Sequence, residues 1–305
     1  MSIRELVVLG TASQVPTRYR NHNGYFLRWD EEGILFDPGE GTQRQLTLAD
    51  LSASSITRIA ITHFHGDHCL GLAGVTQRLS LDKAQHRVEV YYPASGQVFY
   101  DRLRRASIFQ NQIEVKACPI HNAGPQYRGR KFTLSCLPLD HGVDTWGYRL
   151  EEHDDCTMLP DKLAAFGIAG PAVGVLKRQG WLETADARVT LDEVSLFRPG
   201  QRVAFVMDTR LCDNAFALAE KADLLICEST YLSSESREAQ ANGHLTAAQA
   251  ARIARESGAT KLVLSHFSQR YPSTAPFLHE AQEIFPNVVV ARDLDHIAVP
   301  KRIKA

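Results

Sequence analysis

The chain has 305 residues, in which 34 Lys and Arg balance 35 Asp and Glu to leave a formal net charge of −1. Hydrophobic residues make up 44% and charged residues 23%, a balance that is typical of a soluble globular protein and excludes a disordered or low-complexity chain. The near-zero charge also removes the simplest argument for a nucleic-acid partner, a strongly basic chain, although local basic patches remain compatible with it.

Further classes are excluded by features that the sequence lacks. No apolar run approaches the roughly 18 residues of a membrane span, so no membrane partner is expected. The N-terminal residues lack the basic region, apolar stretch and cleavage site of a signal peptide. The six cysteines are scattered without a Cys-x-x-Cys pair, and we therefore expect reduced thiols in a cytoplasmic protein.

Short β-rich runs alternate with helical stretches along most of the chain. Strands are predicted, in chain order, at Leu6–Leu9, Gly24–Trp29, Ile34–Asp37, Ile56–Thr62, Arg87–Tyr92, Ile113–Cys118, Phe132–Leu139, Trp146–Leu150, Val203–Asp208, Leu224–Glu228, Leu262–His266 and Val288–Ala291. Helices are predicted at Leu70–Leu81, Gln97–Ala106, Ala215–Lys221, Thr246–Ser257 and Pro276–Phe285. Many of the strands are continuously apolar, which indicates sheets covered by helices and hence an α/β sandwich.

The pattern changes between residues 151 and 198. This segment is polar, and glycines such as Gly167, Gly174 and Gly180 interrupt its short helical pieces. An ordinary long connection is the alternative, but connections of this length are uncommon without a function. We predict a single domain over residues 1–305 that carries an inserted arm at residues 151–198.

Histidine is the unusual residue, with twelve in the chain. His63, His65, Asp67 and His68 place four ligand-type side chains within six residues, directly after a predicted strand. Imidazole and carboxylate groups suit zinc and related first-row ions, and such crowding has no packing advantage. The cluster therefore predicts a metal site.

Additional ligands are expected from the ends of other strands. Polar residues of the right type follow apolar strands at four positions: Asp37, His141, Asp208 and His266. Ligand sites in open α/β sheets lie beyond the carboxyl ends of the strands, so these side chains can converge on one site. Taken singly, each could be an ordinary structural residue.

In this arrangement and order, the residues resemble the metallo-β-lactamase superfamily. The resemblance implies an αββα sandwich with two zinc ions per subunit. It implies that one zinc is held by His63, His65 and His141, and the other by Asp67, His68 and His266. Asp208 would bridge both ions, and Asp37 would contact and support the ligands without binding an ion itself. The motif alone does not choose among lactam, thioester and phosphodiester hydrolysis.

Other segments, spread over nearly the whole chain, resemble the ribonuclease Z family of tRNA 3′-end processing endonucleases. They are Leu9-Gly10-Thr11, the run from Phe36 to Gln43, and the run from Leu264 to Tyr271. The loop Pro16–Asn21 resembles one that reads the acceptor end of tRNA, which would make Arg18, Arg20 and Asn21 RNA-binding residues. A solvated basic loop is the alternative.

The arm resembles that family's tRNA-binding exosite. Its Gly170-Pro171 element and the charges of Lys177 and Arg178 would contact RNA, because glycine permits close approach and cations bind phosphates. Gly-Pro is also a common turn. By the same resemblance the active form would be a homodimer whose substrate is precursor tRNA.

Two departures from the family pattern touch the chemistry. Cys227-Glu228-Ser229-Thr230 stands where His-Glu-Ala-Thr is frequent, and His244-Leu245-Thr246 stands where His-Ser-Thr is frequent. Both residues that the reaction needs are retained. We expect His244, oriented by Glu228, to protonate the leaving 3′ oxygen, and Asp67 to accept a proton from the attacking water. An exposed loop histidine is the alternative for His244.

The resemblance implies a zinc-dependent endoribonuclease that cuts after the discriminator nucleotide. The products would be a tRNA with a 3′-OH and a trailer with a 5′-phosphate. One alternative is a hydrolase of small phosphodiesters or thioesters on the same fold. The other is a non-catalytic RNA-binding module that retains a metal, although no expected ligand is missing from this sequence.

Overall fold

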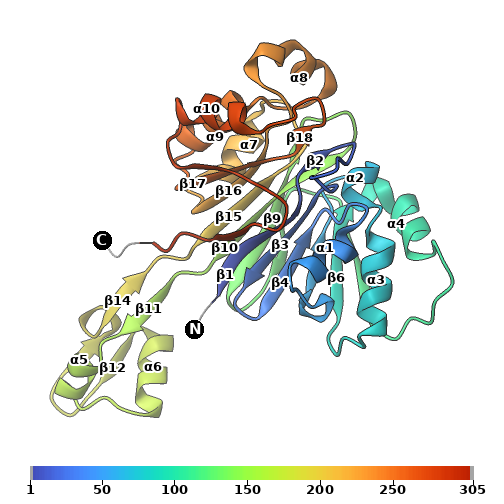
Figure 1. The fold of residues 1–305 in the computed structure, drawn as a ribbon. Helices are drawn as coiled ribbons and strands as arrows, with labels where there is room; N and C mark the ends of the chain where they lie inside the picture. The colour runs from blue at the N-terminus through green and yellow to red at the C-terminus, as the bar shows by residue number, and fades with distance from the viewer. Residues whose placement is uncertain (1–2, 303–305) are drawn as a thin grey trace. The chain divides into compact units, whose positions relative to one another are not determined.

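In the computed structural model, which describes residues 3–302, two seven-stranded sheets pack face to face (Figure 1). The first has the strand order β20-β1-β3-β4-β5-β6-β7, with β1 (Arg4–Gly10), β3 (Gly24–Trp29), β4 (Glu32–Phe36), β5 (Arg58–Ala60), β6 (Val88–Pro93), β7 (Val115–Ile120) and β20 (His296–Ala298). The second has the order β19-β17-β16-β15-β10-β9-β8, with β8 (Gly124–Arg128), β9 (Phe132–Leu139), β10 (Thr145–Glu152), β15 (Arg202–Val206), β16 (Leu224–Glu228), β17 (Lys261–Ser265) and β19 (Val288–Val290).

The main core lies between the sheets and is aromatic. Phe36 of the first sheet stacks on Phe205 of the second, with ring centroids 4.6 Å apart. Tyr25 meets Phe205 edge to face at 5.2 Å. Burial of such rings removes a large apolar area from water, and their interdigitation packs the two sheets against each other.

Helices cover the outer face of each sheet, and each forms a further apolar core there. The first sheet is covered by α1 (Thr42–Leu48), α3 (Leu72–Leu81) and α4 (Gln97–Arg104). The second is covered by α7 (Asp213–Ala219), α9 (Ala247–Glu256) and α10 (Ala275–Gln282). The predicted αββα sandwich is confirmed. The short helices α2 (Gly66–Cys69) and α8 (Ser236–Asn242) complete this part of the chain.

The direction of the parallel strands brings the residues at their carboxyl ends to the same region. Strands β4, β5 and β6 run parallel in the first sheet, and β15, β16 and β17 run parallel in the second. The residues that follow parallel strands emerge on one side of each sheet, where a shared site can form. A short parallel pair, β2 (Ala12–Ser13) with β18 (Phe267–Ser268), ties the start of the chain to the segment after β17.

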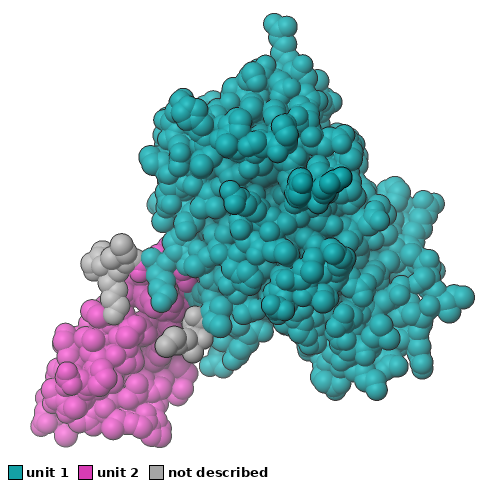
Figure 2. Space-filling model, in the orientation of Figure 1, with its two compact units in different colours: residues 1–150, 202–301 teal, residues 151–201, 302–305 magenta. Residues whose placement is uncertain are grey.

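The chain divides into two compact units, coloured separately in Figure 2. The sandwich is one unit. The segment predicted as an arm, residues 151–198, lies within the other, which spans residues 151–201. That unit contains β11 (Asp155–Met158) paired with β14 (Ser195–Arg198), β12 (Trp181–Glu183) paired with β13 (Arg188–Thr190), and helices α5 (Pro160–Ala165) and α6 (Pro171–Gln179). Its small core is built from Leu163, Ile168, Leu176, Val189 and Val194.

Several strands have the predicted bounds, and β3, β9 and β16 match them to the residue. Helix α1 and strand β8 were not predicted. The first begins after Gly41, whose φ is 84°, and has a mostly polar sequence. The second contains Gly124 and Pro125, which argue against a strand in a sequence reading. Within residues 3–302, no helix combines the length and apolar character needed to cross a membrane.

Candidate metal centre

The predicted ligands converge at the strand ends from four directions. His63, His65, Asp67 and His68 follow β5, and α2 begins within this run at Gly66. His141 follows β9, Asp208 follows β15 and His266 follows β17. Asp208 and His266 have positive φ angles of 49° and 62°, so the chain turns sharply where each strand ends and aims the side chain into the site.

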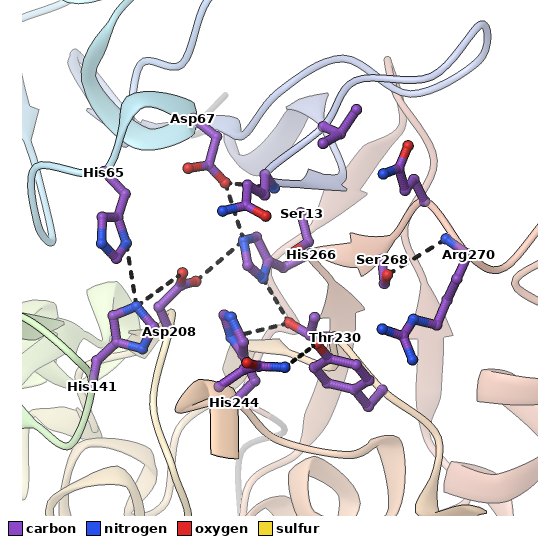
Figure 3. A pocket seen from close by; sticks show the side chains of 15 residues that line it. Ser13, His65, Asp67, His141, Asp208, Thr230, His244, His266, Ser268 and Arg270 are labelled. Atoms are coloured by element: carbon purple, nitrogen blue, oxygen red, sulfur yellow. Dashed lines mark hydrogen bonds and ion pairs between the residues drawn. The ribbon is translucent and has the colours of Figure 1, made fainter. Parts of the chain in front are cut away.

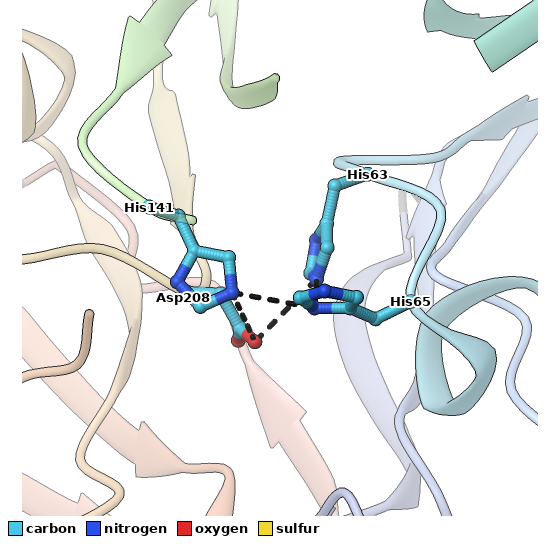
Figure 4. A group of neighbouring side chains, drawn as sticks. All are labelled: His63, His65, His141 and Asp208. Atoms are coloured by element: carbon cyan, nitrogen blue, oxygen red, sulfur yellow. Dashed lines mark hydrogen bonds and ion pairs between the residues drawn. The ribbon is translucent and has the colours of Figure 1, made fainter. Parts of the chain in front are cut away.

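One donor group consists of His63, His65, His141 and Asp208 (Figure 4). His63 Nε2 lies 2.9 Å from His65 Nδ1, and His141 Nε2 lies 3.3 Å from the same atom. Asp208 Oδ2 is 3.6 Å from His63 Nε2 and 3.8 Å from His141 Nε2. Three imidazole nitrogens and a carboxylate oxygen therefore face one point.

The second donor group consists of Asp67, His68 and His266, and it also contacts Asp208. Asp67 Oδ2 lies 3.4 Å from His68 Nε2 and 3.6 Å from His266 Nε2. Asp208 Oδ2 is 3.3 Å from His68 Nε2, while its Oδ1 is 3.3 Å from His266 Nε2. Asp208 thus lies between the two groups and offers oxygen atoms to both.

In four of the histidine rings, a hydrogen bond holds Nδ1 so that Nε2 can act as a ligand. Thr62 Oγ1 donates to Asp37 and Thr230 Oγ1 donates to Glu228, so each hydroxyl must accept the N–H of the neighbouring histidine. This fixes the tautomer and leaves Nε2 unprotonated toward the donor groups. The bonds are His63 Nδ1 to Thr62 Oγ1 at 2.9 Å, His266 Nδ1 to Thr230 Oγ1 at 2.8 Å, His68 Nδ1 to Asp37 Oδ2 at 2.8 Å, and His141 Nδ1 to Gly243 O at 2.8 Å.

Charge and burial show that this set fits cations. Asp37, Asp67 and Asp208 are all at most 7% exposed, and buried carboxylates require positive charge nearby. Within residues 3–302, buried atoms Asp208 Oδ1 and His266 Nε2 make no hydrogen bond, although both face the cluster. Histidine and aspartate ligands in this number suit zinc and neighbouring first-row metals.

The pKa shifts follow from the same arrangement. Burial lowers the pKa of His63, which keeps that ligand neutral. Burial also lowers the pKa of His68, but the Asp208, Asp67 and Asp37 carboxylates outweigh it and raise that pKa well above its ordinary value. The pKa of Asp67 lies well below its ordinary range because the nearby His68 overcomes the effect of burial. The His68 ring thus carries a positive charge among these carboxylates. Bound cations would supply that positive charge instead.

His244 lies beside the donor groups on the wall of the pocket (Figure 3). It forms a separate pair with Glu228. Glu228 is fully buried and accepts hydrogen bonds from Thr209 N at 2.7 Å and from Thr230 Oγ1 at 2.6 Å. His244 Nδ1 lies 3.1 Å from Glu228 Oε1. Burial alone would lower the pKa of His244, but the Glu228 carboxylate raises it to about 9. His244 is therefore cationic at neutral pH, and its side chain lines the cleft described next.

A cleft of about 450 Å³ opens over the two donor groups. Its walls include ligand residues, His244, the turn at Gln14 and Val15, and Arg270. Arg270 donates to Glu235 Oε1 at 2.9 Å and lies 4.9 Å from the centre of the Tyr231 ring. A cationic side chain is thus held at the wall of the cleft, which favours a negatively charged substrate.

Three predicted RNA-binding residues lie on a loop beside an adjoining cleft of about 580 Å³. Arg18 is exposed there. Arg20 Nη2 instead donates to the carbonyls of Ser268 at 3.3 Å and Tyr271 at 2.9 Å, and the Asn21 amide donates to His22 O and Glu40 O. Both side chains thus help to hold the loop, and their predicted contacts with RNA stay a prediction.

The predicted residues of the other unit are placed differently. Gly170 has φ 55° and ψ −133°, a conformation that glycine adopts without strain, and Pro171 begins α6. Lys177 Nζ forms an ion pair with Asp155 Oδ1 at 2.8 Å. Arg178 is exposed on the same helix. Of the two predicted cations, Lys177 already has an acidic partner.

Sequence reasoning missed several residues that support the site. Thr62 and Thr230, which set the ring tautomers, lie next to assigned residues and could have been found as neighbouring hydroxyl groups. Asn23 and Tyr25 carried no such signal. Asn23 Nδ2 lies 3.2 Å from His68 Nε2, and the Tyr25 hydroxyl donates to Asn23 Oδ1 at 2.8 Å. Both are fully buried beneath the donor groups.

Comparison with known proteins agrees with this geometry. Residues 17–266 match the Metallo-beta-lactamase superfamily. Proteins named Ribonuclease Z are 58% identical in Salinispora arenicola and 54% identical in Streptomyces coelicolor, each over 99% of this chain and 98% and 100% of their own lengths. The crystal structure of human tRNase Z, short form, is 25% identical with a TM-score of 0.71, covering 97% of this chain and 99% of that one. A metallo-beta-lactamase fold protein of Bacillus subtilis, YhfI, is 18% identical with a TM-score of 0.71 over 97% of this chain and 99% of its own, which shows the fold alone.

Proposed function

This chain belongs to the ribonuclease Z family of the metallo-β-lactamase superfamily, and from that membership we propose that it removes the 3′ trailer of precursor tRNA. It is a metal-dependent nuclease. The cut that we propose falls after the discriminator nucleotide and leaves a 3′-OH on the tRNA and a 5′-phosphate on the trailer. The observation that carries this proposal is the pair of donor groups sharing Asp208, with the cationic His244 on the wall of the same cleft.

We propose zinc as the metal, two ions per subunit, because each donor group supplies the histidines and carboxylate that zinc prefers. His63, His65 and His141 would hold one ion, Asp67, His68 and His266 the other, and Asp208 both. Bound zinc would lower the pKa of a coordinated water to about 7 and offset the negative charge of the phosphoryl group.

The side chains of this protein move the protons. Asp67 lines the cleft, and we propose that it accepts the proton of the attacking water. His244 carries a proton at neutral pH, and Glu228 orients its ring. We propose that His244 gives this proton to the leaving 3′ oxygen, which is otherwise a poor leaving group. Arg270 would contact a phosphate of the chain next to the cut.

Mapping the product ends tests the proposed function. Zinc-loaded protein is incubated with a precursor tRNA that carries a 3′ extension, and both fragments are sequenced. We expect one cut after the discriminator nucleotide, a tRNA fragment that poly(A) polymerase can extend, and a trailer that a 5′-phosphate-dependent exonuclease degrades. A chelator should abolish the cut, and added zinc should restore it.

Three outcomes would contradict the proposal. Hydrolysis of small phosphodiesters or thioesters without cleavage of precursor tRNA would identify a small-molecule hydrolase. RNA binding without any turnover would identify a metal-containing binding module. Undiminished cleavage in the presence of the chelator would contradict the role of the metal.

A role of residues 151–201 in RNA binding is a further part of the proposal, and it predicts a selective loss. Asp155 and Arg198 are Cα partners in an antiparallel ladder, so an Asn-Gly turn can replace residues 156–197 between them. We expect the Kd for precursor tRNA to rise by about 10- to 100-fold, since phosphate contacts dominate such affinity. Hydrolysis of bis(p-nitrophenyl) phosphate should change little.

Point variants refine this test. Arg178→Ala should weaken binding more than Lys177→Ala, because Lys177 already pairs with Asp155. Equal losses on precursor tRNA and on the small phosphodiester would show that the segment has only a structural role. We also propose that the protein acts as a homodimer in the cytoplasm, as the family resemblance implies.

A further inference from the structure

A strained turn lies directly against one of the metal ligands. Gln14, which follows β2, has a φ of 57°, a left-handed conformation that is uncommon for a residue other than glycine. Its backbone N–H donates to Asp67 Oδ2 at 2.7 Å. Asp67 Oδ2 is also the oxygen that lies nearest to His68 Nε2 and His266 Nε2. The strained conformation therefore delivers a hydrogen bond to the oxygen that faces the second donor group.

His22 holds the other side of this turn. His22 is only 8% exposed, and its side-chain Nε2 lies 3.1 Å from Gln14 O. Because a carbonyl oxygen only accepts, the ring must donate its Nε2–H. Asp67 thus binds the peptide group before Gln14 and His22 binds the peptide group after it. Together with the hydrogen bond from Val15 N to Ser13 O at 2.6 Å, which closes the turn, they hold both dihedral angles of the strained residue.

The surrounding chain leaves His22 little room to move. A Cβ at Gly39 would lie 2.2 Å from Asp67 O and 2.8 Å from His22 Cβ, so only glycine allows these segments to approach so closely. The N–H of Gly39 donates to Asn23 O at 2.8 Å. His22, Gly39 and Asp67 therefore form one packed group behind the second donor group, and no step of the proposed reaction uses His22.

We propose that His22 is a positioning residue for Asp67, acting through the backbone of Gln14. Without the His22 bond, the Gln14 carbonyl loses its partner, and the turn keeps only the bond from Val15 N to Ser13 O and its bond to Asp67. We expect the strained residue to shift toward an ordinary backbone conformation, which weakens its hydrogen bond to Asp67 Oδ2. Hydrogen bonds that orient a ligand tune metal affinity. The proposal rests on the proposed two-cation site and assigns His22 to the Asp67, His68 and His266 group only, because His63, His65 and His141 do not contact this turn through any of the bonds described above.

The test compares three variants by zinc titration against a chromophoric chelator and by hydrolysis of bis(p-nitrophenyl) phosphate. His22→Ala should bind one of the two zinc ions about 10-fold less tightly and the other as tightly as the wild type, with a similar fall in kcat, as for other residues that orient a ligand. His22→Gln places an amide N–H at a comparable reach and should regain most of both. His86→Ala is the matched control, since His86 Nε2 makes the same kind of bond, 2.8 Å to Ile56 O, at the end of β5 opposite to the ligands.

The outcomes separate the alternatives. Wild-type zinc affinity at both sites in His22→Ala would overturn the proposal, and so would a loss that His22→Gln fails to restore. An equal loss in His86→Ala would show that any buried histidine bond has this effect, which would also overturn it. The zinc titration decides the matter without RNA, so a failure of precursor tRNA cleavage would count against the proposed function and not against the role of His22.

Discussion

An Asp208→Asn enzyme should lose roughly 10³-fold or more in kcat/KM on precursor tRNA, since metal stabilisation is worth several kcal/mol and about 1.4 kcal/mol corresponds to a factor of ten. Asp208 is the residue that contacts both donor groups. An amide has nearly the same shape, but it carries no charge and offers only one acceptor oxygen. We therefore expect zinc content to fall below two per subunit, which atomic absorption would measure.

Asp140→Asn is a suitable control for this variant. Asp140 precedes a ligand, His141, yet its side chain is 56% exposed and pairs with Arg210 at 3.1 Å on the surface. Its replacement should leave zinc content and turnover close to those of the wild type, because exposed ion pairs contribute little. An Asp208→Asn enzyme that keeps two zinc ions and full turnover would contradict the assignment of Asp208 as the shared ligand.

Replacing His244 by alanine should lower kcat on precursor tRNA by about 10²- to 10⁴-fold, the usual contribution of a general acid. Zinc content should not change. The same variant should hydrolyse bis(p-nitrophenyl) phosphate almost as fast as the wild type, because p-nitrophenolate leaves without a proton. Equal losses on both substrates would show that His244 positions the substrate and does not protonate the leaving group.

The pH dependence of turnover tests the role of His244 independently. His244 is the acid only while protonated, so turnover should fall as the pH rises toward its pKa of about 9. Zinc ions in the adjoining donor groups would lower that midpoint, since nearby positive charge disfavours the protonated ring. Glu228→Gln should shift the decline to lower pH.

The ion pair between His244 and Glu228 also stabilises the folded protein. This contribution is fully present below pH 6.5 and disappears as the pH rises through about 9.

The convergence of the proposed metal ligands was predictable because their signal is local and redundant. Four of them lie within six residues, and the others each end an apolar strand, so both the crowding and the strand pattern indicate one site. Convergence follows from strand direction, which the alternation of strands and helices already implies. The ring tautomers were not predictable from pattern, because Thr62 and Thr230 act through hydroxyl groups whose direction depends on Asp37 and Glu228.

Other features depended on contacts between distant segments. The sequence predicts Arg20 to be a cation available to a ligand. In the structure it donates hydrogen bonds to the carbonyls of Ser268 and Tyr271, which lie far along the chain. The core of residues 151–201 was hidden because its few apolar residues are separated by glycines and charged residues. The left-handed turn at Gln14 has no sequence signature at all, since glycine is the residue that such a conformation favours.

The order of the ligands along the chain has a consequence for how the enzyme is made. The donor groups draw on residues from His63 to His266, which lie far apart in the chain. A chain still emerging from the ribosome therefore lacks a complete set of ligands until His266 has been added. We expect an unfinished chain that ends before His266 to be unable to hold both metal ions, and hence unable to cut RNA beside the ribosome that is making it.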